Sequence, residues 1–211
     1  MFPLGMNANQ PLMDQLPEPE LIRSIQSLRR ENKVQDAPAL LKQQAKDRLD
    51  FSEEAQDQLP HLEAECHHDS GDHARAVATY DRILVRRGDS VAHANRALAY
   101  SAMGDARRAI DGYGQAMRTD PADLLVLIGL GESCNRREEY ALSLEPLRAA
   151  AALYPEDART LCALGVAYHN LEDWCRAYKA ITRAVELDPE NRVARPGNSK
   201  FGQEFGLSED S

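Results

Sequence analysis

Residues 158–191 read ARTLCALGVAYHNLEDWCRAYKAITRAVELDPEN, and this stretch decides the fold because its pattern recurs along the chain. The two segments before it, 90–123 and 124–157, align with it without a gap. Prolines near the ends of these three copies are spaced by 34 residues: Pro121, Pro155 and Pro189. A fourth copy, 57–89, is one residue shorter and lacks this proline. A fixed period of this kind predicts a solenoid of stacked units.

Each copy has small residues at two places, counted from its first residue. The eighth place holds Ala64, Ala97, Gly131 and Gly165, and the twentieth holds Ala76, Ala109, Ser143 and Ala177. Turn signals separate these places: Gly71-Asp72, Gly104-Asp105, Glu138-Glu139 and Glu172-Asp173. Small residues let two helices approach closely, and a proline cannot continue a helix, so each copy is predicted to be a helical hairpin.

The period and these places resemble the tetratricopeptide repeat, a two-helix unit of 34 residues. The resemblance implies an all-α fold, a right-handed α-α superhelix of three clear repeats plus one degenerate repeat, with the first helices lining a concave face. The 57–89 copy is the degenerate one because Pro60 falls in its expected opening turn and Glu63 stands where leucine is usual. Pro146, inside the second helix of the 124–157 copy, predicts a kink.

The limits of the repeats set the predicted domain organisation. A disordered N-terminus, a helical N-terminal extension, a repeat domain and a flexible C-terminal tail are predicted, in this order, over 1–17, 18–56, 57–191 and 192–211. The extension is expected to form one helix over 19–32 and a second over 37–55. We further hypothesise that Phe201, Phe205 and Leu207 fold back over the last helix, unless a second copy or a partner covers it.

Composition and charge exclude several classes of protein. The formal net charge is −9, with no strongly basic block, so nucleic-acid binding is not expected. No apolar run is long enough to insert into a membrane and no secretory signal is visible, so the sequence predicts a cytoplasmic protein. It contains no Gly-rich phosphate loop, GxSxG or HExxH, so we expect no catalytic residue, no cofactor and no enzymatic activity.

The resemblance also implies a site, because tetratricopeptide proteins hold partner segments along their first helices. The residues implied to form this groove are His61, Glu65, His68, Ala94, Asn95, Leu98, Ile128, Glu132, Asn135, Arg136, Arg159, Cys162, Val166, His169 and Asn170. Of the carboxylate-clamp set that binds a C-terminal carboxylate, only Asn95 is present. The expected partner is therefore another protein, through an extended or helical segment with small apolar anchors, and a homodimer is left open.

The function predicted from these features is that of a non-catalytic protein-binding module: an adaptor, an assembly scaffold or a chaperone. Residues 129–147, GLGESCNRREEYALSLEPL, resemble the second repeat of the class II chaperones of bacterial type III secretion, which protect translocator proteins. Arg137 replaces a glycine of that class. This chaperone is the alternative, and a metal-binding or enzymatic protein is the rival class.

The stretch 61–73 carries that rival interpretation, because it is rich in histidine and includes Cys66. His61, Glu65 and either His68 or Asp69 share one helical face and could converge on a metal ion. The spacing fixes no fourth ligand, so the interpretation with no metal is favoured. It makes this stretch the first wall of the groove, responsive to pH near neutrality.

Overall fold

The computed structural model describes residues 18–31, 33–37, 40–41, 52–86 and 88–189. The chain divides into two compact units with the boundary between Arg87 and Gly88, called unit 1 and unit 2 below. Within the described ranges the regular elements are all helices, so the predicted all-α fold is confirmed. No helix in these ranges is both long and apolar enough to cross a bilayer.

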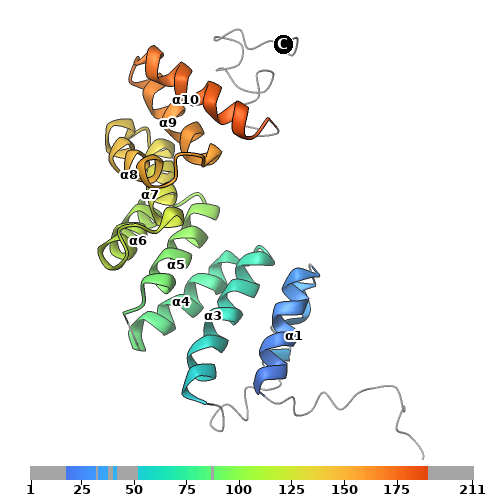
Figure 1. Ribbon diagram of the computed structural model, residues 1–211. Helices are drawn as coiled ribbons and strands as arrows, with labels where there is room; N and C mark the ends of the chain where they lie inside the picture. The colour runs from blue at the N-terminus through green and yellow to red at the C-terminus, as the bar shows by residue number, and fades with distance from the viewer. Residues whose placement is uncertain (1–17, 32, 38–39, 42–51, 87, 190–211) are drawn as a thin grey trace, which may run out of the picture. The chain divides into compact units, whose positions relative to one another are not determined.

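Unit 1 contains α1 (Glu18–Arg30), the short 3-10 helix η2 (Val34–Asp36), α3 (Glu53–Asp69) and α4 (His73–Arg86) (Figure 1). Helix α3 packs against both α1 and α4. The apolar face of α1, with Leu21 and Ile25 fully buried, meets Leu59, Leu62 and Cys66 of α3. The predicted N-terminal extension therefore contributes to one core with the first hairpin.

Two predictions for this region are wrong, and one residue explains both. Ser52 has ψ 156°, outside the helical range, and its hydroxyl accepts a hydrogen bond from the Ala55 amide at 3.2 Å. This N-cap starts α3 at Glu53, so no single helix runs over 37–55, and Pro60 lies inside α3 rather than in an opening turn. A serine cap followed by two glutamates favours a helix start more strongly than the repeat frame does.

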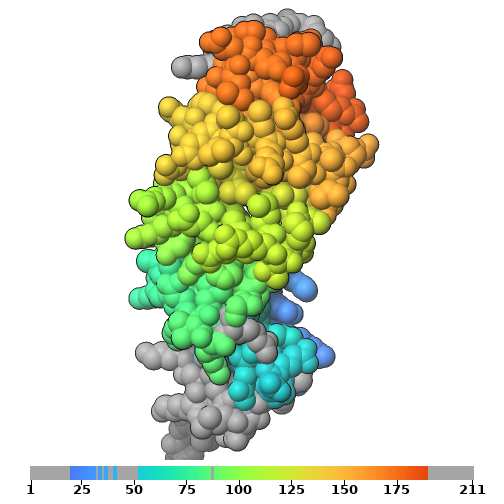
Figure 2. All heavy atoms as spheres, turned by 90° about the vertical axis from the view of Figure 1, so that its left-hand side faces the viewer, coloured from blue at the N-terminus to red at the C-terminus, as the bar shows by residue number. Residues whose placement is uncertain are grey.

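Unit 2 contains three helical hairpins: α5 (Ser90–Ala102) with α6 (Ala106–Thr119), α7 (Leu124–Arg136) with α8 (Tyr140–Leu153), and α9 (Ala158–Asn170) with α10 (Trp174–Leu187). Figure 2 shows them as successive bands from green to orange, in chain order. Aspartates cap the first helices: Asp89, Asp123 and Asp157 each accept a backbone N–H of the first turn. Each hairpin lies within one of the segments 90–123, 124–157 and 158–191.

Close helix approach occurs where the sequence places small residues. A Cβ on Gly112 of α6 would lie 2.9 Å from the Cβ of Ala97 in α5, and one on Gly131 of α7 would lie 2.6 Å from Leu147 Cδ2 in α8. Pro146 is buried within α8, which continues to Leu153. The kink predicted there stays a prediction.

The turns between paired helices require a left-handed residue. Gly71 and Gly104 have φ +80°, and Glu138 and Glu172 take the same region at φ 64° and 60°. The two glutamates show that the fold imposes this conformation even where glycine is absent. The predicted ends, 1–17 and 192–211 with Phe201, Phe205 and Leu207, lie outside the described residues, and the predicted domain limits remain predictions.

Candidate functional site

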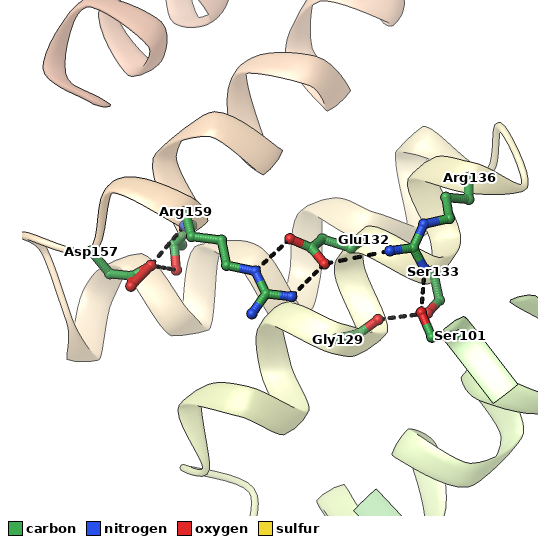
Figure 3. A network of polar contacts seen from close by, with 8 residues as sticks. Ser101, Gly129, Glu132, Ser133, Arg136, Asp157 and Arg159 are labelled. Carbon is green, nitrogen blue, oxygen red and sulfur yellow. Dashed lines mark hydrogen bonds and ion pairs between the residues drawn. The ribbon is translucent and has the colours of Figure 1, made fainter. Parts of the chain in front are cut away.

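The first helices of unit 2 form one surface, which we call the first-helix face. Helix α7 lies between α5 and α9 and contacts both (Figure 1). Its polar centre is Glu132 of α7. Arg159 of α9 donates two hydrogen bonds to this carboxylate, from Nε to Oε1 and from Nη2 to Oε2, each at 2.7 Å (Figure 3). Such a bidentate pair fixes the orientation of both groups.

A second guanidinium extends this contact to the third helix. Arg136, one turn after Glu132 on α7, places Nη2 3.8 Å from Glu132 Oε2 and donates through Nη1 to the Ser101 hydroxyl of α5. Figure 3 shows the resulting row from Arg159 through Glu132 and Arg136 to Ser101. The side chains of Arg136 and Arg159 are 49% and 50% exposed, and that of Glu132 is 23% exposed. One carboxylate is therefore shared by two guanidinium groups that face solvent.

Neighbouring residues hold this row in place. Asp157 caps α9 by accepting from the Thr160 amide at 2.8 Å and hydroxyl at 2.9 Å, which fixes the helix start that carries Arg159. The buried ring of Tyr113 in α6 packs on Gly129, one turn before Glu132. The pKa of Tyr113 is raised to about 12, mainly by burial and also by the charge of Glu132, while Arg159 and Arg136 act in the opposite direction. The hydrogen bonds to Glu132 raise the pKa of Arg159.

Exposed apolar side chains accompany the charged row on the same helices. Leu98 of α5, one turn before Ser101, is 41% exposed. Val91 of α5 and Leu125 of α7 are 54% and 68% exposed. Asn135 donates through Nδ2 to the carbonyl of Ala163 at 2.9 Å and so links α7 to α9. The face thus combines fixed polar groups with apolar side chains left in water.

The structure separates the predicted groove residues of unit 2 into surface and interior. Leu98, Arg136, Arg159 and Asn170 are exposed, whereas Ala94, Asn95, Glu132, Asn135, Val166 and His169 are partly buried. Ile128 is 1% exposed and packs with Leu127 and Ala150, and Cys162 is 4% exposed and packs with Ala184. These two side chains belong to the interior, and assigning them to a ligand surface was wrong.

In unit 1 the three predicted groove residues lie on α3 as expected, but a neighbouring helix reaches them. Arg29 of α1 pairs with Glu65 and, at 2.7 Å, with Asp69. The ring centroids of His68 and His73 are 4.8 Å apart, and those of His61 and Tyr80 are 6.3 Å apart. The carboxylates needed for the metal hypothesis thus bind a guanidinium. In the part of the chain that the structure describes, no group of three His, Cys, Asp or Glu side chains is arranged to hold a metal ion.

Sequence reasoning missed how these residues pair and what supports them. Glu132 and Arg159 are the ninth place of one copy and the second place of the next, 27 residues apart. Opposite charges at this spacing are a signal that could have predicted the pair. Tyr113 carried no such signal, because an aromatic residue at the twenty-fourth place is expected for packing alone.

Comparison with known proteins identifies the fold. The tetratricopeptide repeat family model matches residues 158–191. MamA 41-end from Desulfovibrio magneticus RS-1 is 19% identical, with a TM-score of 0.71 over 82% of this chain and 96% of that one. YrrB, described as a TPR protein with an unusual peptide-binding site, is 15% identical, with a TM-score of 0.66 over 82% and 88%.

A third solved structure extends the match along the chain. A tetratricopeptide repeat protein from Parabacteroides merdae is 15% identical, with a TM-score of 0.72 over 90% of this chain and 73% of that one. Identities this low carry the fold alone. The family model thus matches the last hairpin, and the chain shares the all-α superhelical repeat fold of these solved tetratricopeptide repeat structures.

Proposed function

We propose that the protein is a non-catalytic protein-binding module that holds a segment of another protein against the first-helix face of unit 2. The observation that carries this is the exposure of Leu98 and Val91 on α5 and of Leu125 on α7, at 41%, 54% and 68%, together with the half-exposed Arg136 on α7 and Arg159 on α9. A shared fold with YrrB, which has a peptide-binding site, supports the same function. The protein would act as an adaptor, an assembly scaffold or a chaperone.

The energetics favour this face as a contact surface. Covering an exposed aliphatic side chain releases roughly 25 cal/mol per Å² of apolar area. Arginine is among the residues that dominate binding energies, and Arg159 is already held by its bidentate pair, so little side-chain entropy is lost when a partner binds. Apolar anchors beside oriented polar donors suit an extended or helical segment.

The test compares two double variants of the full-length protein in affinity capture followed by mass spectrometry. Leu98→Asp/Arg136→Glu changes the first-helix face. Leu142→Asp/Arg107→Glu makes the same substitutions at exposed positions of the second helices α8 and α6 and is the matched control. We expect specific partners to be lost with the first variant and kept with the second. Partners kept by both would refute the proposal.

A sharper form, a class II chaperone of type III secretion translocators, rests on residues 129–147. Arg137, where that class has glycine, has φ −88° and ψ 2°, and the left-handed residue of the turn is Glu138. The position therefore does not need glycine, and this departure from the class is no steric obstacle. Co-expression with a translocator should keep it soluble and co-purified, and aggregation equal to that without the protein would refute this form. Light scattering would test the homodimer.

A further inference from the structure

The charged row of the first-helix face has a charge opposite to that of the whole chain. In this row two guanidinium groups, those of Arg136 and Arg159, share the single carboxylate of Glu132. The chain as a whole has a formal net charge of −9. A locally basic surface on an acidic protein attracts an acidic partner and disfavours non-specific contact with copies of itself.

The two guanidinium groups are oriented but not neutralised. Arg159 uses Nε and Nη2 for Glu132, and no hydrogen bond among the described residues reaches its Nη1. Arg136 lies 3.8 Å from the same carboxylate, and its other contact is the neutral hydroxyl of Ser101. Because a guanidinium has five N–H groups and both side chains are half-exposed, donors remain for a second carboxylate.

An apolar contact adjoins these donors. Leu98 lies one helical turn from Ser101, the residue that Arg136 contacts, and is 41% exposed. A partner side chain that pairs with Arg136 thus brings the neighbouring residue of its segment to Leu98. The arrangement fits an acidic residue next to an aliphatic one.

We infer that the face recognises an acidic-aliphatic segment of the partner, and that Glu132 is an internal stand-in for the partner's carboxylate. In the unbound protein Glu132 keeps the two arginines oriented. In the complex the partner's carboxylate takes a share of their donors. This inference rests on the proposed function, because it names the partner chemistry of that same face.

The probe is a displayed library of random twelve-residue peptides, selected on the full-length protein and in parallel on the Leu98→Asp/Arg136→Glu variant. We expect peptides with Asp or Glu beside an aliphatic residue to be enriched on the wild-type protein only. Fluorescence anisotropy then compares the strongest peptide with its Glu→Gln or Asp→Asn twin. The acidic peptide should bind more tightly than its twin, and its binding should weaken as salt is raised.

Three single variants test the role of Glu132. Glu132→Gln removes the competing charge and should tighten binding of the acidic peptide about twofold to fivefold, the range of one partly exposed ion pair. Arg159→Gln should weaken it by a similar factor. Glu145→Gln, at an exposed position of α8, is the matched control and should change nothing. Circular dichroism confirms that each variant is folded.

The outcomes separate this inference from the proposed function. If no peptide is enriched on the wild-type protein above its level on the Leu98→Asp/Arg136→Glu variant, both the inference and the proposed function are overturned. Enriched peptides without an acidic excess would leave the binding function and overturn the inference. Acidic peptides that bind Glu132→Gln no more tightly than the wild type would overturn the stand-in role, since Glu132 would then only position Arg159.

Discussion

Replacing Gly112 by alanine tests the close helix approach on which the fold of unit 2 depends. The added Cβ would lie 2.9 Å from the Cβ of Ala97 and 3.4 Å from the carbonyl oxygen of His93, both in α5. Ala97 is fully buried and its methyl group is fixed to the backbone, so no side-chain rotation can relieve the overlap. Helices α5 and α6 must therefore move apart by roughly several tenths of an ångström, because a closely packed interior has no room for an added methyl group.

The neighbouring glycine in the same helix provides the reference. A Cβ on Gly114 meets no atom within 4 Å. Gly114→Ala therefore gains only the helix propensity of alanine, about 0.5–1 kcal/mol. Gly112→Ala gains the same amount but loses about 1–3 kcal/mol to overpacking, so we expect a net destabilisation of about 1 kcal/mol. The difference between the two variants isolates the packing cost.

The assay is urea denaturation of full-length protein followed by far-ultraviolet circular dichroism. The midpoint should rise for Gly114→Ala and fall for Gly112→Ala, with a thermal shift of about 2–4 °C per kcal/mol. If Gly112→Ala were as stable as Gly114→Ala, the helices would not approach at Ala97 as described. Because the helix and the substitution are the same, changes in the unfolded state cannot account for a difference.

Three other predictions concern the thiols, one histidine and the two ion pairs of one arginine. Cys66, Cys134 and Cys162 are buried, and burial raises the pKa of each thiol. The pKa values of Cys66 and Cys162 rise to about 11. Only Cys175, which is exposed, should react with a thiol reagent in the folded protein. Reaction of the folded Cys175→Ser variant with the reagent would contradict this. Burial, then the charge of His73, lowers the pKa of His68 below 6.5. Below about pH 6.5 the unfolded chain therefore binds more protons than the folded one, so the free energy of unfolding is highest above this pH and falls as the pH drops towards the lowered pKa. The urea midpoint should fall between about pH 7.5 and 5.5, and it should fall less in His68→Gln than in the wild-type protein. Arg29→Ala removes both ion pairs to α3 and should lower the free energy of unfolding by about 1 kcal/mol at low salt. Arg23→Ala, at an exposed position of the same helix, is the control and should change it little. Equal shifts of the melting temperature in the two variants would show that the ion pairs contribute nothing.

The sequence predicts what depends on local spacing. Helical hairpins follow from a period that keeps the eighth place small, and Gly131 and Gly165 at that place lie directly against Leu147 and Ile181 of the paired helix. The contact between Ala97 and Gly112 was not predicted, because Gly112 is at neither of the two small places of the repeat. Ile128 and Cys162 were misassigned because a repeat place defines a direction around a helix and not how closely the next helix packs there. The start of α3 was misplaced because the cap at Ser52 is specific to this copy.

The ninth place shows how one repeat position can serve two purposes. Glu65 and Glu132 hold it in their copies, and each pairs with an arginine from a neighbouring helix, Arg29 or Arg159. In unit 1 one guanidinium meets two carboxylates, because Asp69 also pairs with Arg29, and the cluster has an excess negative charge. In unit 2 two guanidinium groups share one carboxylate, and the excess is positive. The first cluster links α1 to its hairpin, whereas the second leaves half-exposed donors on a face with exposed leucines. We therefore propose recognition of acidic segments for unit 2 and not for unit 1.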